Sequence, residues 1–142
     1  MYSLIVMAWN PIQIIAQSTD KNYIISKTFL DDTGTTTLES INYINERNRI
    51  VQTTQKEASP NHKDIINIQV FDGLNRIATS WLPITIAANG QYINPSTIQQ
   101  TASIFYDDES PFSHNVYESS HLNRVLEKYG PGSDWNNRNK KL

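Results

Sequence analysis

Between two β-prone runs the chain reads Val70-Phe71-Asp72-Gly73-Leu74-Asn75-Arg76-Ile77. The same order of an aromatic or β-prone residue, a short polar turn and Asn-Arg-aliphatic recurs over residues 43–50 and 116–125. The first two copies align without a gap, and the third is two residues longer in the turn. A repeated turn cassette predicts several hairpins that form in the same way and stack side by side. Such an arrangement favours a scaffold over a catalytic pocket.

The polar residues of the cassette have distinct conformational roles. In a three-residue hairpin loop, a type I turn is followed by one left-handed residue that closes a bulge. Asparagine is the best substitute for glycine there, so we expect Asn48 and Asn75 to be left-handed. Asn45 and Asp72 start the turns, because their side chains can accept from the backbone N–H two residues on. Each following arginine should begin the return strand and face the turn-starting residue, rather than bind a ligand.

These arguments give one set of structural turn residues. It comprises Asn45, Asn48, Arg49, Asp72, Gly73, Asn75, Arg76, Asn123 and Arg124.

Composition excludes several classes of protein. A length of 142 residues suits one domain. Only 18% of the residues are charged and the formal net charge is −2, so no overall field would attract nucleic acid or acidic lipid. Cysteine is absent, which excludes a disulfide framework, a thiol nucleophile and a cysteine-based zinc site.

Residues 1–16 are apolar but interrupted by Asn10-Pro11, and no lysine or arginine precedes Lys21. We interpret this segment as a degraded or wrongly started export signal, with an apolar first strand or a disordered extension as the alternative. The run falls short of the ~20 apolar residues that a spanning helix needs, so we expect no transmembrane segment. The expected location is secreted or in the cell envelope.

The rest of the chain predicts a mainly β fold, an antiparallel meander of about five strands. The expected strands span residues 22–30, 36–44, 49–56, 63–71 and 76–82, and the third cassette adds a hairpin over 116–128. In the fourth strand, one face carries Ile66, Ile68 and Val70, and the other carries Ile65 and Phe71. Because both faces have apolar residues, we expect this strand to be covered on both faces.

One short helix is predicted around residues 95–106. Asn94 would be its N-cap and Pro95 its first residue, and Ile98, Ala102 and Phe105 would lie on one side. Residues 107–109, Asp-Asp-Glu, should end the helix, because acids are unfavourable at its C-terminus. This triplet lacks the alternating spacing of a calcium loop, so we expect solvated charge there.

The cassette resembles the signature of the Rhs or YD-repeat family of large secreted bacterial proteins, with Asn75 where that family usually has glycine. Residues 18–135 further resemble a domain of unknown function at the N-terminus of Rhs-type proteins. The matching pieces are Asp20-Lys21-Asn22-Tyr23-Ile24, Val51-Gln52-Thr53, Ser59-Pro60-Asn61-His62-Lys63-Asp64, Trp81-Leu82-Pro83, residues 116–125, and Gly130-Pro131-Gly132-Ser133-Asp134-Trp135. The resemblance implies one YD-repeat-like β domain over residues 18–135, followed by a polar tail at 136–142. In the family such a domain leads into a repeat array that forms a β-sheet shell.

Catalysis is not expected. His62, His114 and His121 have no metal-ligand spacing, and Ser119-Ser120-His121 has no partner acid at a diagnostic distance. Carboxylate pairs could be drawn from several acidic residues, as in any acidic protein. These are Asp31, Asp32, Asp107, Asp108 and Glu109. No cofactor or metal site is expected.

Two function classes remain. The first is a non-catalytic structural module of an exported Rhs/YD-repeat protein, as a fragment or stand-alone remnant, that contributes to or caps a β-sheet shell. Its expected partners are a downstream repeat array or a second copy, through an edge strand. The alternative is a small glycan- or protein-binding module that uses the rings of Trp81, Tyr92 and Trp135 as stacking platforms.

Overall fold

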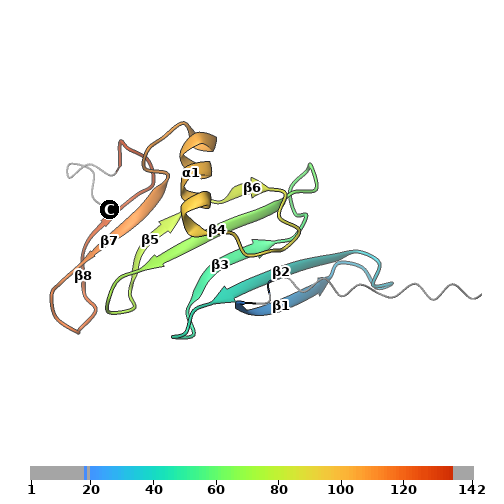
Figure 1. Ribbon diagram of the computed structural model, residues 1–142, viewed down its shortest axis with the longest axis horizontal. Helices are drawn as coiled ribbons and strands as arrows, with labels where there is room; N and C mark the ends of the chain where they lie inside the picture. The colour runs from blue at the N-terminus through green and yellow to red at the C-terminus, as the bar shows by residue number, and fades with distance from the viewer. Residues whose placement is uncertain (1–17, 19, 136–142) are drawn as a thin grey trace, which may run out of the picture.

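The computed structural model describes residue 18 and residues 20–135. Eight antiparallel strands of this part form one sheet in the order β1-β2-β3-β4-β5-β7-β8, with β6 paired to β4 (Figure 1). The elements are β1 (Asn22–Phe29), β2 (Thr37–Ile44), β3 (Ile50–Gln55), β4 (Asp64–Phe71), β5 (Ile77–Trp81), β6 (Ile84–Ile86), α1 (Pro95–Tyr106), β7 (Phe112–Tyr117) and β8 (Val125–Tyr129). The predicted mainly β class with one short helix is confirmed.

The strand β6 is the element that the sequence did not predict. It lies beside the first half of β4, where Ile84 is opposite Ile66, while β5 lies beside the second half, where Thr79 is opposite Val70. Pro83 stands between β5 and β6 and interrupts what would otherwise be one strand, because it lacks the N–H that a ladder needs. The interruption lets β5 pair with β7 on its other side.

The helix α1 packs over β4, β5 and β6 (Figure 1). Asn94 caps it by accepting a hydrogen bond from the Ser96 N–H at 3.0 Å. Ile98 and Ala102 are fully buried against the isoleucines of β4 and β6. Phe105, which was expected on the same side as Ile98 and Ala102, differs from them in being 55% exposed. Tyr106 packs against the core instead, and its hydroxyl donates to the Pro83 carbonyl at 2.5 Å. In the last turn of α1, Tyr106 and not Phe105 therefore faces the sheet.

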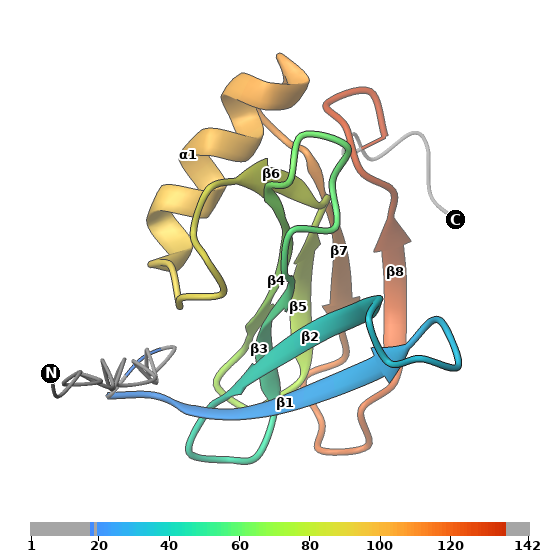
Figure 2. The same ribbon diagram turned by 90° about the vertical axis from the view of Figure 1, so that its right-hand side faces the viewer.

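The two faces of β4 differ in their cover. Ile66 and Ile68 are buried under α1, whereas Asn67 is exposed and Ile65 is half-buried on the other face. Figure 2 shows α1 on one side of the sheet, and the described residues include no second helix that could cover the other side. The expectation that β4 is covered on both faces is therefore wrong, and its apolar residues on the second face are only partly removed from water.

The sheet twists strongly, so that β1 and β2 run across the view in Figure 2 while β7 and β8 run up it. The strands at the two ends of this order are β1 and β8, each paired on one side only within the described residues. All three cassette turns lie at the same end of the sheet, the lower end in Figures 1 and 2. Within the described part of the chain, no helix is long and apolar enough to cross a membrane.

Candidate functional site

The three cassette turns share one backbone conformation. Asn48, Asn75 and Asn123 have φ angles of 61°, 62° and 57°, in the left-handed region that was predicted for Asn48 and Asn75. Each hairpin also shifts register by one residue just before its turn, as in a bulge. The third turn is longer but closes in the same way, so all three hairpins are built by one rule.

The residues that start the first two turns fix them through the same pair of hydrogen bonds. Asn45 Oδ1 accepts from the N–H groups two and four residues on, at 3.0 and 2.9 Å. Asp72 Oδ1 accepts from its own pair at 3.0 and 2.9 Å. In the third turn Ser120 takes this role, three residues before Asn123, and its Oγ accepts from the Leu122 N–H at 3.1 Å. The signal for Ser120 was that three-residue spacing, which the sequence reasoning did not use.

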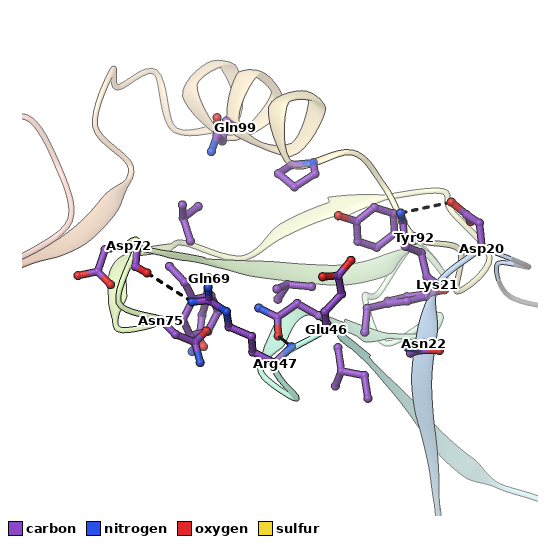
Figure 3. A pocket seen from close by; sticks show the side chains of 18 residues that line it. Asp20, Lys21, Asn22, Glu46, Arg47, Gln69, Asp72, Asn75, Tyr92 and Gln99 are labelled. Carbon is purple, nitrogen blue, oxygen red and sulfur yellow. Dashed lines mark hydrogen bonds and ion pairs between the residues drawn. The ribbon is translucent and has the colours of Figure 1, made fainter.

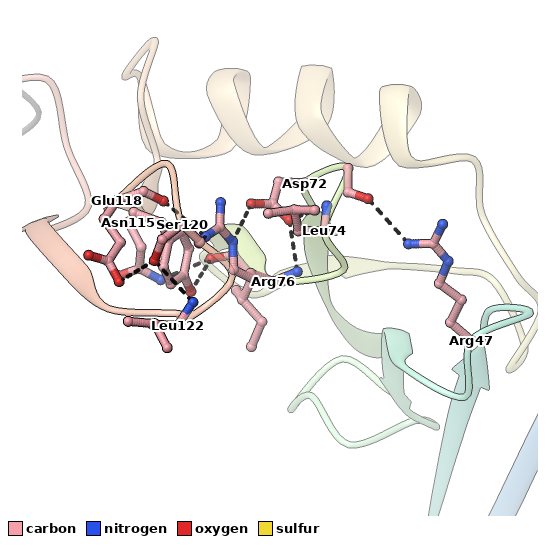
Figure 4. A network of polar contacts seen from close by, with 11 residues as sticks. Arg47, Asp72, Leu74, Arg76, Asn115, Glu118, Ser120 and Leu122 are labelled. Atoms are coloured by element: carbon pink, nitrogen blue, oxygen red, sulfur yellow. Dashed lines mark hydrogen bonds and ion pairs between the residues drawn. The ribbon is translucent and has the colours of Figure 1, made fainter.

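Gly73 is not held in a left-handed backbone, and a Cβ at this position would meet nothing within 4 Å. Its contribution is its carbonyl, which accepts from Arg47 Nη1 at 3.4 Å. Arg47 belongs to the first turn, so this hydrogen bond links the first hairpin to the second (Figure 4).

Arg76 links the second hairpin to the third (Figure 4). Its Nε pairs with Asp72 Oδ2 at 2.7 Å, and its Nη1 donates to the carbonyls of Glu118 and Ser120 at 3.2 and 3.4 Å. Its guanidinium lies 4.4 Å from the centre of the Tyr117 ring. Hydrogen bonds from the Arg76 N–H and side chain lower the pKa of Asp72, so this carboxylate stays charged opposite the arginine. The turn arginines thus hold neighbouring hairpins together as well as their own.

The other two predicted arginines are exposed. Arg124 pairs with Glu118 through its Nε at 3.4 Å, and its side chain is 69% exposed. Arg49 follows Asn48 in the first turn and is also exposed. Of the three arginines at this cassette position, Arg76 is the one whose side chain the described structure encloses.

A cleft of about 830 Å³ opens between the first two cassette turns, the start of α1 and the residues before β1 (Figure 3). Its rim carries both signs of charge, with Lys21 and Arg47 among the cations and Glu46 among the acids. Tyr43, Phe71 and Tyr92 are the aromatic residues that line it. The centre of the Tyr92 ring lies 5.2 Å from that of Tyr43 and 5.4 Å from the Lys21 ammonium. A cleft of this size with a mixed polar and apolar lining can hold a short peptide or an oligosaccharide.

The three aromatic residues proposed as stacking platforms do not form one surface. Tyr92 lines the cleft, but Trp81 is half-buried and packs against Phe112 with ring centres 4.7 Å apart. Trp135 is 47% exposed beside the Gly132 turn. Trp81 therefore contributes to packing, which removes much of the support for a glycan platform along the sheet.

Two of the five acidic residues considered for catalysis, Asp31 and Asp108, hold turns together. Asp31 accepts hydrogen bonds from Thr35 and Thr36, and these bonds hold the pKa of its carboxyl far below the usual range. Asp108 accepts from Ser110 and Ser133, and the same cause lowers its pKa. It thereby ties the end of α1 to the segment after β8, while its neighbours Asp107 and Glu109 are exposed, as expected of solvated charge.

The histidines and the serine pair do not assemble into a site. His114 lies on β7, stacked on Tyr129 with ring centres 4.4 Å apart. Ser120 is committed to the third turn, next to His121 in sequence. Among the described residues no group of three potential metal ligands comes together.

Comparison with known proteins adds a family. The model of one family, described as a domain of unknown function (DUF6443), matches residues 16–142. The chain belongs to the DUF6443 family. No curated protein matches this DUF6443 chain, and no solved structure matches it. The resemblance to a domain of unknown function is thereby confirmed at the level of this family.

The left-handed turn residue makes a direct prediction for stability. Replacing Asn75 by glycine is expected to leave the free energy of unfolding unchanged or to raise it, whereas valine is expected to lower it by about 1–2 kcal/mol. The cause is the φ of 62°, which a β-branched residue tolerates poorly. Urea unfolding measures both variants, with Leu74→Val as the control in the same turn. Equal stabilities of Asn75→Gly and Asn75→Val would contradict this account of the turn.

Proposed function

We propose that this DUF6443 chain is a non-catalytic structural module of an exported Rhs/YD-repeat protein, which contributes to or caps a β-sheet shell. The observation that carries the proposal is the row of three cassette hairpins at one end of one sheet, linked turn to turn by Arg47 and Arg76. Such a row is suited to extension, because each hairpin pairs with the next through its outer strand.

The edge strand β8 supports the same proposal. Val125 is 49% exposed and Leu126 is 64% exposed, and Leu122 in the turn before them is 66% exposed. An exposed edge that carries apolar side chains is a template for pairing with another strand. Glu127 and Lys128 are the charged residues of β8, and charged side chains blunt an edge without pairing its backbone groups.

Sedimentation from micromolar to millimolar concentration tests the proposal. We expect the chain to self-associate through β8, and a separately added repeat-array chain to raise its melting temperature. Leu126→Lys should suppress both effects, because it places a charge on the edge. Ile104→Lys is the matched control, since Ile104 is 81% exposed on α1, away from β8. A chain that stays monomeric and does not respond to the repeats would contradict the proposal.

The second candidate is a small glycan- or protein-binding module, and the cleft at Tyr92 is the observation that favours it. A sugar stacked on the Tyr92 ring on the Lys21 side would have to displace that ammonium. Screening against oligosaccharides and short peptides, with Tyr92→Ala as the comparison, tests this candidate. Saturable binding that Tyr92→Ala abolishes would support it, and binding unaffected by Tyr92→Ala would contradict it.

A further inference from the structure

The contact between the second and third hairpins shows how one cassette hairpin receives the next. The strands β5 and β7 pair with Thr79 opposite His114. Arg76 reaches across the same boundary, with its Nη1 on the Glu118 and Ser120 carbonyls and its guanidinium over the Tyr117 ring. The receiving side is thus an arginine after a left-handed asparagine. The incoming side is an aromatic residue followed by two turn carbonyls.

The third hairpin reproduces the receiving side on its outer edge. Arg124 follows the left-handed Asn123, as Arg76 follows Asn75. Its Nε pairs with Glu118, the acidic residue that follows β7 at the start of the turn, as the Nε of Arg76 pairs with Asp72, which follows β4. The two arginines differ in enclosure, since the Arg124 side chain is 69% exposed and that of Arg76 is 13% exposed.

We propose that Arg124 and the β8 edge form the docking site for a further β-hairpin that carries the same turn cassette. The carbonyls of the incoming turn accept hydrogen bonds from Arg124, and the aromatic residue before that turn stacks under its guanidinium. This inference rests on the proposed function and adds to it the chemistry of the partner and the residue that sets its register.

The existing hairpin contact also predicts the register of the new one. Thr79, which lies opposite His114, is three residues after Arg76, and Glu127 is three residues after Arg124. In the first strand of the incoming hairpin, the residue that corresponds to His114 is therefore expected to lie opposite Glu127. A second folded copy of the chain cannot supply this cassette strand, because its own β7 is already paired on both sides by β5 and β8, so the self-association expected above would pair β8 with another edge strand. The partner is thus a separate hairpin of a repeat segment.

The probe is a backbone-cyclised peptide with the sequence of residues 112–129, which contains the third cassette hairpin. Cyclisation is needed because an isolated hairpin is marginally stable. Titration calorimetry of the full chain with this peptide is expected to give saturable binding. Arg124→Ala should weaken the binding at least about tenfold, because it removes charge-assisted hydrogen bonds and a stacked cation. Arg124→Lys should recover part of the loss, since lysine keeps the charge but not the planar fork.

Arg49→Ala is the matched control, because Arg49 occupies the same cassette position on the first hairpin and is also exposed. It should bind the peptide as the wild-type chain does. Arg124→Ala and Arg49→Ala should both have the melting temperature of the wild-type chain, which would exclude a general loss of folding as the cause of weaker binding. Equal affinities of the wild-type chain and Arg124→Ala would overturn the role of Arg124 and leave the proposed function standing. Absence of peptide binding by the wild-type chain would also overturn the inference, and the sedimentation experiment would then decide the proposed function separately.

Discussion

Replacing Asp64 by alanine is expected to lower the free energy of unfolding by about 2–4 kcal/mol. Asp64 is 1% exposed, at the start of β4. Its Oδ1 accepts from the Glu57 N–H at 2.9 Å, and its Oδ2 accepts from the buried Gly90 N–H at 2.6 Å. Alanine leaves both donors without these acceptors and opens a cavity, and a buried backbone N–H without a partner is costly.

Urea unfolding of three variants measures this effect. Asp64→Asn should cost less than Asp64→Ala, because one of its two polar atoms remains an acceptor. Asp32→Ala is the control, since Asp32 is an exposed acid in the turn between β1 and β2. Similar stabilities for Asp64→Ala and Asp32→Ala would show that the Gly90 and Glu57 N–H groups find other partners.

The effect of Asp64 should extend to the cleft. The segment around Gly90 is held to the sheet by three side chains, since Gly90 also accepts from the Tyr43 hydroxyl at 2.6 Å, and Gln52 Oε1 accepts from the Ile93 N–H at 3.2 Å. This segment carries Tyr92 and leads directly into the N-cap of α1. Loosening it in Asp64→Ala would therefore move both this aromatic residue of the cleft and the start of the helix.

The features that the sequence predicted are those set by neighbours in the chain. The left-handed asparagines, the turn-starting side chains and the N-cap Asn94 each depend on residues within a few positions. The chemistry of each turn is therefore visible in a single cassette. The positions of the five meander strands follow from the same local turns, since each turn sets the start of the next strand.

The features that the sequence did not predict depend on distant residues. The hydrogen bond from Gly90 to Asp64 spans 26 positions, and those from Arg76 to Glu118 and Ser120 span 42 and 44. Nothing local distinguishes Arg76 from Arg49 or Arg124, although one is enclosed and the others are exposed. The strand β6 was missed for a similar reason, because its three residues after Pro83 are assigned only by their pairing with β4.

The last prediction concerns Arg76 itself, which we expect to hold the third hairpin on the sheet. Arg76→Ala should lower the free energy of unfolding by about 2–3 kcal/mol, because it removes hydrogen bonds to Asp72, Glu118 and Ser120 together with the cation–π contact to Tyr117. Arg49→Ala at the same cassette position should have little effect, since its side chain is exposed.

Hydrogen exchange would locate the change caused by Arg76→Ala. Faster exchange is expected in β7 and β8, with β1 to β3 unaffected, because the lost contacts join the second hairpin to the third and leave the first untouched. Uniform acceleration across the whole sheet would contradict this account, since it would mean that Arg76 stabilises the fold as one unit. A local effect would show that each turn arginine acts at the boundary between two hairpins. The same energetic role would then be open to Arg124 once another hairpin lies beside β8.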